Sequence, residues 1–454
     1  MSALPPLPEA FAARMREQLG GEADAFFAAL QAPALRGLRL NPRKPLPALE
    51  RPQGLLEAIP WAVNGHWLSP ESQAGAHPLH EAGAYYLQEP SAMLPARILA
   101  PRPGERVLDL CAAPGGKSTQ LADMLEGQGL LVCNEPVPSR AQVLSRNVER
   151  MGVPNALVVC ADPGALAQAW PRAFDAVLVD APCSGEGMFR RHPETRLQWR
   201  ESSPAGCAAR QRRILASAYA LLRPGGRLVY STCTFSPEEN QGMAAWFRQA
   251  FPDMEPEEFS VPAGEGRALF SQEGMLQALP HRLPGEGHFL AKLRKSGAGE
   301  HPQTAFLAPA QVLKSPSPGP LAAFTQFLAH SAPEASATVP PPNAMLGDTL
   351  LSAPLLPPLR GIKVLRAGLH LGGMKGKAFA PDHALALGLP VPFPFPSVSL
   401  SLSQAQAYQR GESLFPKDAP RGYVLAAYAG LALGWAKGSD GQLKNHYPKG
   451  LRRP

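Results

Sequence analysis

Apolar runs and helically spaced stretches alternate along the chain from about residue 100. Strand-like runs occur at 107–110, 130–135, 156–162, 176–180, 227–232 and 288–293. Strands that alternate with helices at this spacing predict a parallel, doubly wound α/β sheet. The runs are almost continuously hydrophobic, as expected of strands that are buried on both faces. We therefore predict a large α/β domain over residues 76–295.

The pattern differs on both sides of this domain. Residues 1–75 combine helical stretches with one strand-like run, 37–42, and predict a small N-terminal α+β domain. Residues 296–345 are rich in Pro, Gly and Ser, and they predict a linker and irregular segment. Short β-like runs in 346–454 predict a β-rich C-terminal domain.

Composition and charge narrow the classes of function. The chain has 454 residues, of which 45% are hydrophobic and 18% charged, as in folded multidomain proteins. A formal net charge of +7 favours a polyanionic partner. No apolar run approaches the roughly 20 residues of a membrane helix, and the N-terminus lacks a signal-peptide pattern. Six cysteines without a CxxC pair disfavour a disulfide framework or a zinc cluster. We expect a cytoplasmic monomer without a bound metal.

Acidic residues end the first four predicted strands of the α/β domain. They are Asp109, Glu135, Asp162 and Asp180. Ligands of open α/β sheets bind at the carboxyl ends of strands, and a carboxylate about 20 residues after a glycine loop suits a ribose diol. Four acids would repel a triphosphate and suit a ligand that is neutral or cationic near an adenosine. Each acid has an alternative role as the N-cap of the next helix.

The stretch CAAPGGKS at 111–118 follows the first strand and resembles a P-loop, G-x-x-x-x-G-K-[ST]. Cys111 stands where the first glycine of that pattern belongs, and Pro114 interrupts the loop. An NTPase therefore stays as an alternative, with the strand 177–180 as its Mg²⁺-binding strand. The acids at the strand ends argue against it.

Two cysteines lie in loops at neighbouring strand ends. Cys183 follows the fourth strand, and Cys233 lies between the fifth strand and a predicted helix start at Ser236. There Pro237 and Glu239 complete a capping-box pattern. A thiol near a helix N-terminus has a lowered pKa, and neighbouring strand ends bring both thiols to one cleft. Simple packing is expected instead for the cysteines in predicted strands and helices, Cys133, Cys160 and Cys207.

Three motifs together resemble the Nop/Sun family of RNA 5-methylcytosine methyltransferases. They are CAAPGGK at 111–117, DAPCSGEG at 180–187 and STCTFSPEEN at 231–240. The tail 434–453 resembles the PUA-like domain of the bacterial RsmF group, which modifies small-subunit ribosomal RNA. The resemblance implies a Rossmann-like, S-adenosylmethionine-dependent methyltransferase core, flanked by RNA-binding N-terminal and PUA-like C-terminal domains. It also implies 16S ribosomal RNA, near the decoding region, or the small ribosomal subunit as partner.

The resemblance also implies catalytic roles. Carbon 5 of cytosine is too electron-poor to attack a methyl sulfonium, and a thiolate that adds at carbon 6 makes it nucleophilic. By resemblance Cys233 is this nucleophile, Cys183 assists product release and Asp180 hydrogen-bonds the base.

The same resemblance assigns the S-adenosylmethionine site. Glu135 is expected on the ribose hydroxyls, Asp162 on the adenine amino group, and Arg140 as a residue that orders the pocket. The other expected cofactor-binding residues are Cys111, Ala112, Ala113, Pro114, Gly115, Gly116, Lys117 and Asp180.

Basic and aromatic residues suggest RNA contacts in two places. The first group follows Cys183 and consists of Phe189, Arg190, Arg191, Arg196, Trp199 and Arg200. The second lies in the tail and consists of Lys437, Lys444, His446, Tyr447, Lys449, Arg452 and Arg453, with Asp440 as the one acid. Arginines bind phosphates and aromatic rings stack on unstacked bases, whereas the alternative is a solvated face with a buried Trp. A non-catalytic RNA-binding assembly factor on the same fold is a further alternative, against which the two cysteines argue.

Overall fold

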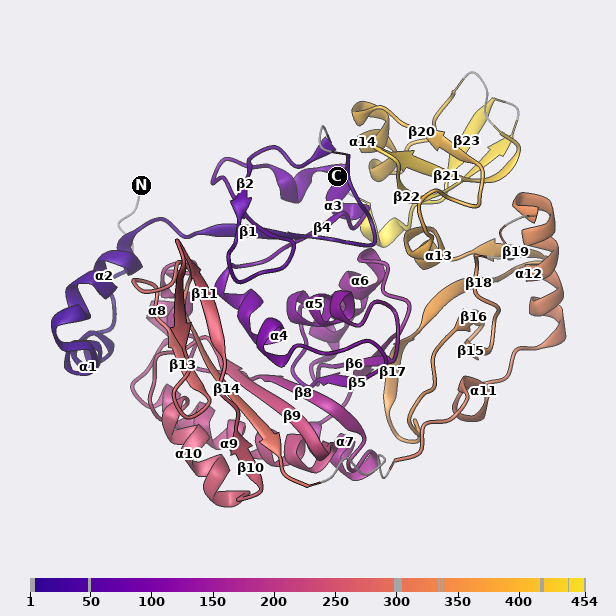
Figure 1. Cartoon of the computed structure of the whole chain (residues 1–454). Coiled ribbons are helices and arrows are strands. Elements are labelled where there is room, and N and C mark those ends of the chain that lie inside the picture. The colour runs from indigo at the N-terminus through magenta and orange to yellow at the C-terminus, as the bar shows by residue number, and fades with distance from the viewer. Residues whose placement is uncertain are drawn as a thin grey trace.

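The computed structural model describes residues 5–47, 50–297, 304–333, 335, 338–416, 420–439 and 441–452. Figure 1 shows the N-terminal helices (indigo) on one side, the central α/β unit (magenta) in the middle and the C-terminal sheets (orange and yellow) on the other side. None of the described helices combines the length and the hydrophobicity that a membrane span requires.

The central sheet confirms the predicted doubly wound α/β core. Its parallel strands lie in the order β9-β8-β5-β6-β7. They are β5 (Arg106–Asp109), β6 (Leu130–Asn134), β7 (Ala156–Cys160), β8 (Phe174–Asp180) and β9 (Leu222–Thr232). The chain runs from β5 outward through β6 and β7 and then returns to β8 on the other side of β5. This reversal of strand order is where open α/β sheets bind ligands.

Antiparallel strands extend the sheet at both edges. The last predicted strand is β14 (His288–Lys295), and it runs antiparallel to β9 rather than parallel. At the other edge, β17 (Lys363–Ala367) pairs with β7 and so brings part of the C-terminal region into the central sheet. The remaining strands here are β10 (Met254–Pro256) and β13 (Met275–Ala278), which pair with β14, and the hairpin of β11 (Ser260–Gly264) and β12 (Arg267–Phe270).

Helices cover both faces of the sheet. Neighbouring residues of one strand, such as Val107 and Leu108, belong to cores on opposite faces, which explains why the strands read as continuous apolar runs. One face packs against α4 (Leu94–Leu99), α5 (Gly116–Met124) and α6 (Pro138–Arg150). The other packs against α7 (Pro163–Ala169), α9 (Ser203–Leu221) and α10 (Gln241–Ala250).

The N-terminal unit combines helices with a four-stranded sheet in the order β2-β3-β1-β4. Because Leu38 pairs with Leu87, this sheet continues past residue 75, where we expected the unit to end. Its elements are α1 (Glu9–Leu19), α2 (Ala23–Gln31), β1 (Arg36–Leu40), β2 (Leu55–Ala58), β3 (Gly65–Leu68), α3 (Pro78–Glu81) and β4 (Tyr85–Leu87).

We expected an irregular segment over 296–345, but part of it is helical. It contains α11 (Pro309–Val312) and α12 (Pro318–Ser331), whose Phe324 and Phe327 are buried. Its Pro-rich run SPSPGP starts a helix because Pro318 occupies the first helical position, where its missing N–H costs nothing. Residues 298–303, 334, 336 and 337 of this segment lie outside the described residues.

The C-terminal region is β-rich, as predicted, and contains two four-stranded sheets. The first consists of β15 (Ala344–Leu346), β16 (Thr349–Ser352), β18 (Leu369–Lys375) and β19 (Ala378–Pro381), followed by α13 (His383–Gly388). The second consists of β20 (Ser397–Ser399), β21 (Gly422–Tyr428), β22 (Leu431–Ser439) and β23 (Gln442–Asn445), with α14 (Leu402–Arg410) between β20 and β21. Pro448, Gly450 and Leu451, near the end of the described chain, lie beside His80 and Glu81 of α3 in the N-terminal unit (Figure 1).

Candidate active site

The loop after β5 shapes one wall of the site. Gly115, with φ of 114°, is the N-cap of α5, and that conformation disfavours any residue with a side chain. Asn147 donates to the carbonyl of Pro114 at 2.9 Å, and Ala112 N donates to Asn134 O at 2.8 Å. The turn is therefore held by both α6 and the neighbouring strand.

Asp109, at the end of β5, is fully buried and contacts the helix that follows this loop. One of its oxygens accepts from Ser118 Oγ on α5 at 2.7 Å. Burial raises the pKa of Asp109 to about 7, against the hydrogen bond from Ser118. Asp109 does not line the cavity at the strand ends. Its hydrogen bond with Ser118 stabilises the start of α5.

A cavity of about 710 Å³ opens at the carboxyl ends of the parallel strands. The predicted site residues that line it are Cys111, Ala113, Glu135, Arg140, Asp162, Asp180, Cys183 and Cys233. Of the other predicted cofactor residues, Ala112, Pro114, Gly115, Gly116 and Lys117 do not line it. One face of α9, formed by Arg210, Arg213, Ile214 and Ser217, also lines the cavity and was not predicted from the sequence.

Two carboxylates stand at the ends of β6 and β7. Glu135 is 2% exposed, accepts from Val137 N at 3.0 Å and pairs with Arg140 Nη1 at 3.3 Å. Arg140 also donates to the carbonyl of Ala113 at 3.2 Å and so ties two loops of the cavity together. Asp162 is the N-cap of α7 and accepts from Gly164 N at 2.8 Å. The capping alternative therefore holds for Asp162, which also lines the cavity.

An ion pair occupies the end of β8. Lys117 Nζ donates to one oxygen of Asp180 at 2.8 Å, and Ser231 Oγ donates to the other at 2.7 Å. Burial alone would raise the pKa of Asp180, but Lys117, His288 and the two hydrogen bonds hold it below its ordinary value. Asp180 is therefore an ionised acceptor at neutral pH.

The structure brings the two loop cysteines together, as their strand order predicted. Cys183 Sγ lies 3.3 Å from Cys233 Sγ, and both thiols line the cavity. The pKa of Cys183 is raised well above its ordinary value, first by the hydrogen bond with Cys233 and then by burial. Cys183 is therefore protonated in this arrangement.

The predicted helix start at Ser236 is wrong. Residues 237–240 form a turn, and α10 begins only at Gln241. Glu239 does not close a capping box, because it accepts hydrogen bonds from Ser184, in the loop of the other cysteine. Cys233 therefore does not lie at a helix N-terminus, because α10 starts eight residues after it.

The expected RNA contacts after Cys183 need correction. Phe189 and Trp199 are 0% and 8% exposed, and they pack with Phe11 and Phe26 of the N-terminal helices instead of facing bases. Arg190 pairs with the buried Glu286 at 2.7 Å. Arg196 donates to the carbonyl of Pro5, whereas the remaining arginines, Arg191 and Arg200, are exposed.

The basic tail is largely exposed. Lys437 on β22 and Lys444 on β23 are directly opposite in the strand register, and such like-charge pairs are unfavourable unless an anion lies nearby. Lys449 and Arg452 are exposed too, and His446 is half-buried. Tyr447 is 2% exposed, so it is a core residue rather than an RNA contact. Asp440 and Arg453 lie outside the described residues.

Models of known families match most of the chain. One described as 16S rRNA methyltransferase RsmB/F matches residues 96–294, and one for the N-terminal domain of 16S rRNA methyltransferase RsmF matches 7–90. The RsmF rRNA methyltransferase first C-terminal domain matches 326–389, and the methyltransferase RsmF PUA domain matches 395–453.

Individual relatives agree with these matches. The ribosomal RNA small subunit methyltransferase F of Citrobacter koseri is 34% identical, and the match covers 98% of this chain and 96% of the relative. The protein of the same name from Escherichia coli is 34% identical with the same coverage. A solved methyltransferase homologue from Pyrococcus horikoshii is 29% identical with a TM-score of 0.53, over 63% of this chain and 95% of that one.

Proposed function

Since the chain belongs to the RsmF family of 16S ribosomal RNA methyltransferases, we propose that it methylates carbon 5 of a cytosine in small-subunit ribosomal RNA, near the decoding region. The observation that carries this proposal is the pair of thiols 3.3 Å apart in a cavity lined by carboxylates. The methyl donor in the proposal is S-adenosylmethionine, and the compartment is the cytoplasm.

The cavity fits the donor in size and chemistry. Its volume of about 710 Å³ lies within the range of small-ligand sites. In this proposal Glu135 accepts from the ribose hydroxyls and Asp162 from the adenine amino group, and both residues line the cavity together with the apolar Pro136, Val137 and Ile214. When bound, S-adenosylmethionine supplies an activated methyl group on a cationic sulfur, whose charge the carboxylates favour.

Cys233 is the nucleophile of the proposed reaction. Its thiolate adds to carbon 6 of cytosine, and the electron pair of the 5,6 double bond moves to carbon 5. Carbon 5 then takes the methyl group, which breaks the donor's methyl–sulfur bond and leaves S-adenosylhomocysteine as the second product. Loss of the carbon 5 proton to solvent and breakage of the carbon 6–sulfur bond restore the double bond and expel the Cys233 thiolate. Asp180, an ionised acceptor beside the thiols, binds the exocyclic amine of the base.

Cys183 has a different part in this proposal. The raised pKa of Cys183 keeps it protonated, so it does not compete with Cys233 for carbon 6. It assists release of the methylated base from Cys233. The target cytosine must leave its stack to reach either thiol, which requires base flipping or a single-stranded site.

Both alternatives from the sequence are disfavoured. A P-loop lysine binds phosphates, whereas Lys117 is engaged by Asp180 at 2.8 Å. A non-catalytic RNA-binding factor would have no use for two thiols held in contact in a ligand-sized cavity.

Methyl transfer to deproteinised 16S RNA and to 30S subunits tests the proposal. With methyl-labelled S-adenosylmethionine, the label should appear in 5-methylcytidine when the digested RNA is resolved by mass spectrometry. The variant Cys207→Ala, a cysteine on α9 outside the cavity lining, should retain the activity. Label in any other nucleoside would contradict the proposed reaction.

A further inference from the structure

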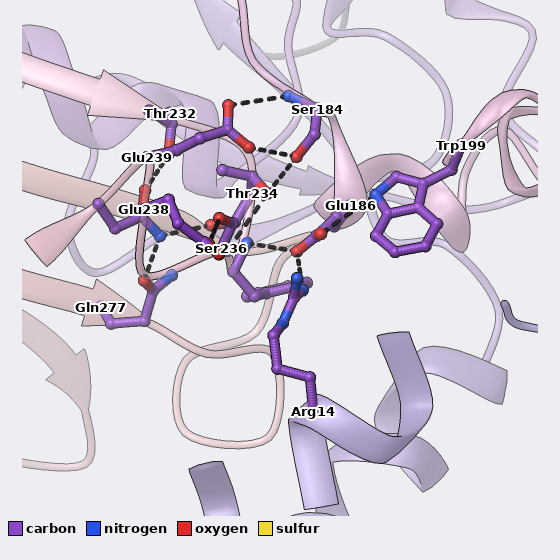
Figure 2. Close-up of polar contacts among 12 residues, drawn as sticks. Arg14, Ser184, Glu186, Trp199, Thr232, Thr234, Ser236, Glu238, Glu239 and Gln277 are labelled. Carbon is purple, nitrogen blue, oxygen red and sulfur yellow. Dashed lines mark hydrogen bonds and ion pairs between the residues drawn. The ribbon is translucent and has the colours of Figure 1, made fainter. Parts of the chain in front are cut away.

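The loops that carry the two thiols are joined by buried carboxylates (Figure 2). One loop contains Cys183 and Ser184 and continues to Glu186, and the other contains Cys233 and Thr234 and continues to Glu239. Glu186 and Glu239 are both 0% exposed, and neither lines the cavity. A buried carboxylate is costly unless its partners satisfy it, so the hydrogen bonds of each one indicate what it does.

Glu239 holds the backbone of the Cys183 loop. Its Oε2 accepts from Ser184 N at 3.0 Å and from Gln211 Nε2 on α9 at 2.8 Å. Its Oε1 accepts from Ser184 Oγ, which also lies 2.8 Å from Thr234 Oγ1. The residue next to Cys183 is therefore fixed by a side chain that comes from the Cys233 side.

Glu186 makes the reciprocal connection. Its Oε2 accepts from Phe235 N, two residues after Cys233, at 3.1 Å. The same carboxylate accepts from Trp199 Nε1 at 3.2 Å and from Arg14 of α1 at 2.6 Å. Between the two carboxylates, Gly187 N donates to the carbonyl of Cys233 itself at 2.8 Å.

Asn240 anchors the Cys233 loop to the sheet beneath it. Its Oδ1 accepts from Thr232 Oγ1 at 2.6 Å, and its Nδ2 donates to Thr234 O and to Gln277 Oε1, each at 2.9 Å. Asn240 thus holds Thr232 and Thr234, on either side of Cys233, independently of the two carboxylates.

We propose that Glu186 and Glu239 are positioning residues, each of which holds the backbone of the loop that carries the other thiol and thereby fixes the separation of Cys183 and Cys233. The inference rests on the proposed function for its catalytic consequence, but not for its geometry. Through Arg14, the N-terminal helix α1 also becomes part of the support of the site.

Glu239→Gln should preserve this support. An amide oxygen accepts from Ser184 N and Gln211, and the amide nitrogen donates to Ser184 Oγ, which turns its proton toward Thr234. Glu239→Ala removes every hydrogen bond of this side chain. Glu239→Asp keeps the carboxylate, but its shorter side chain no longer reaches the Cys183 loop. The matched control is Glu238→Gln, because Glu238 is exposed and its side chain accepts from Ser236 Oγ in its own loop.

The separation of the thiols is measured with phenylarsine oxide. This reagent reacts with two neighbouring thiols to form two arsenic–sulfur bonds and releases its oxygen with both thiol protons as water. Relative to wild type, Glu239→Ala, Glu239→Asp and Glu186→Ala should weaken this chelation about tenfold and slow single-turnover methyl transfer up to about 10²-fold, as expected of small misplacements. Glu239→Gln and Glu238→Gln should match wild type, and the KM for RNA should not change.

The outcomes separate this inference from the proposed function. Wild-type chelation and rate in Glu239→Ala and Glu239→Asp would overturn the positioning role. Loss in Glu239→Gln equal to that in Glu239→Ala would overturn it too, because charge would then matter and not the bonds. If wild type forms no 5-methylcytidine while the variants still differ in chelation, the positioning role stands and the proposed reaction fails.

Discussion

At the scale of single residues, the site depends on charges that are fixed before a ligand binds. Lys117 and Ser231 hold both oxygens of Asp180, and Arg140 holds one oxygen of Glu135. Groups that are oriented in advance need no reorganisation during the reaction. The carboxylates can therefore distinguish a cationic donor from a triphosphate without any change in the fold.

Glu135→Gln should weaken the binding of S-adenosylhomocysteine. A hydrogen bond to a charged acceptor contributes about 1.5–3 kcal/mol, so the dissociation constant should rise about tenfold or more. Glu194→Gln is the control, because Glu194 is an exposed carboxylate that does not line the cavity. Isothermal titration calorimetry gives both constants. An unchanged constant for Glu135→Gln would remove Glu135 from the site.

The sequence predicts those residues of the site that have a reactive or charged side chain at a strand end, such as Cys233 or Glu135. It did not predict Arg210, Arg213, Ile214 and Ser217, although their spacing places them on one face of a helix. That spacing fits a solvated face equally well. Only the packing of α9 against the sheet decides that this face lines the cavity.

At the scale of elements, tertiary contacts override local signals in two places. The pattern from Ser236 to Glu239 fits a capping box, but Glu239 finds a backbone donor in another loop, and the helix begins at Gln241. The aromatic residues after Cys183 are of the type that stacks on RNA bases, but in the structure they pack against the N-terminal helices. Phe11 and Phe189 are in edge contact, with ring centroids 5.0 Å apart.

Phe189→Ala should loosen this docking. Removal of a fully buried Phe costs about 3–5 kcal/mol, and the amides of α1 should exchange hydrogen faster. Leu197→Ala, an exposed neighbour in the same stretch, should change neither stability nor exchange. Thermal unfolding and hydrogen exchange by mass spectrometry give the comparison. Unchanged stability together with weaker RNA binding would instead restore Phe189 as an RNA contact.

At the scale of the whole molecule, buried basic side chains connect the outer units to the central one. Lys44 donates to the carbonyls of Ala82 and Arg150, the first in the N-terminal unit and the second at the end of α6. On the other side, β17 joins the central sheet and Arg366 pairs with Glu149 of α6. The units are therefore joined by contacts between residues that are far apart in the chain. The composition along the sequence contains no signal of such contacts.

Lys44 should make stability depend on pH. Burial, followed by the charges of Arg150 and Arg43, lowers the pKa of Lys44 from 10.5 to about 7. Between these values the unfolded chain binds a proton that the folded protein lacks, so the free energy of unfolding should fall as the pH falls from 10.5 to 7. Urea unfolding at several pH values should show a smaller slope for Lys44→Met. The exposed Lys444→Met should keep the wild-type slope, and equal slopes in all three proteins would contradict the prediction.

The most direct test of the central claim is the covalent complex between the enzyme and its RNA, detected on a denaturing gel with S-adenosylmethionine present. If Cys233 attacks carbon 6 and Cys183 releases the product, Cys183→Ala should accumulate a complex of protein and RNA, and Cys233→Ala should form none and transfer no methyl group. A complex that persists in Cys233→Ala and disappears in Cys183→Ala would contradict the roles assigned to the two thiols.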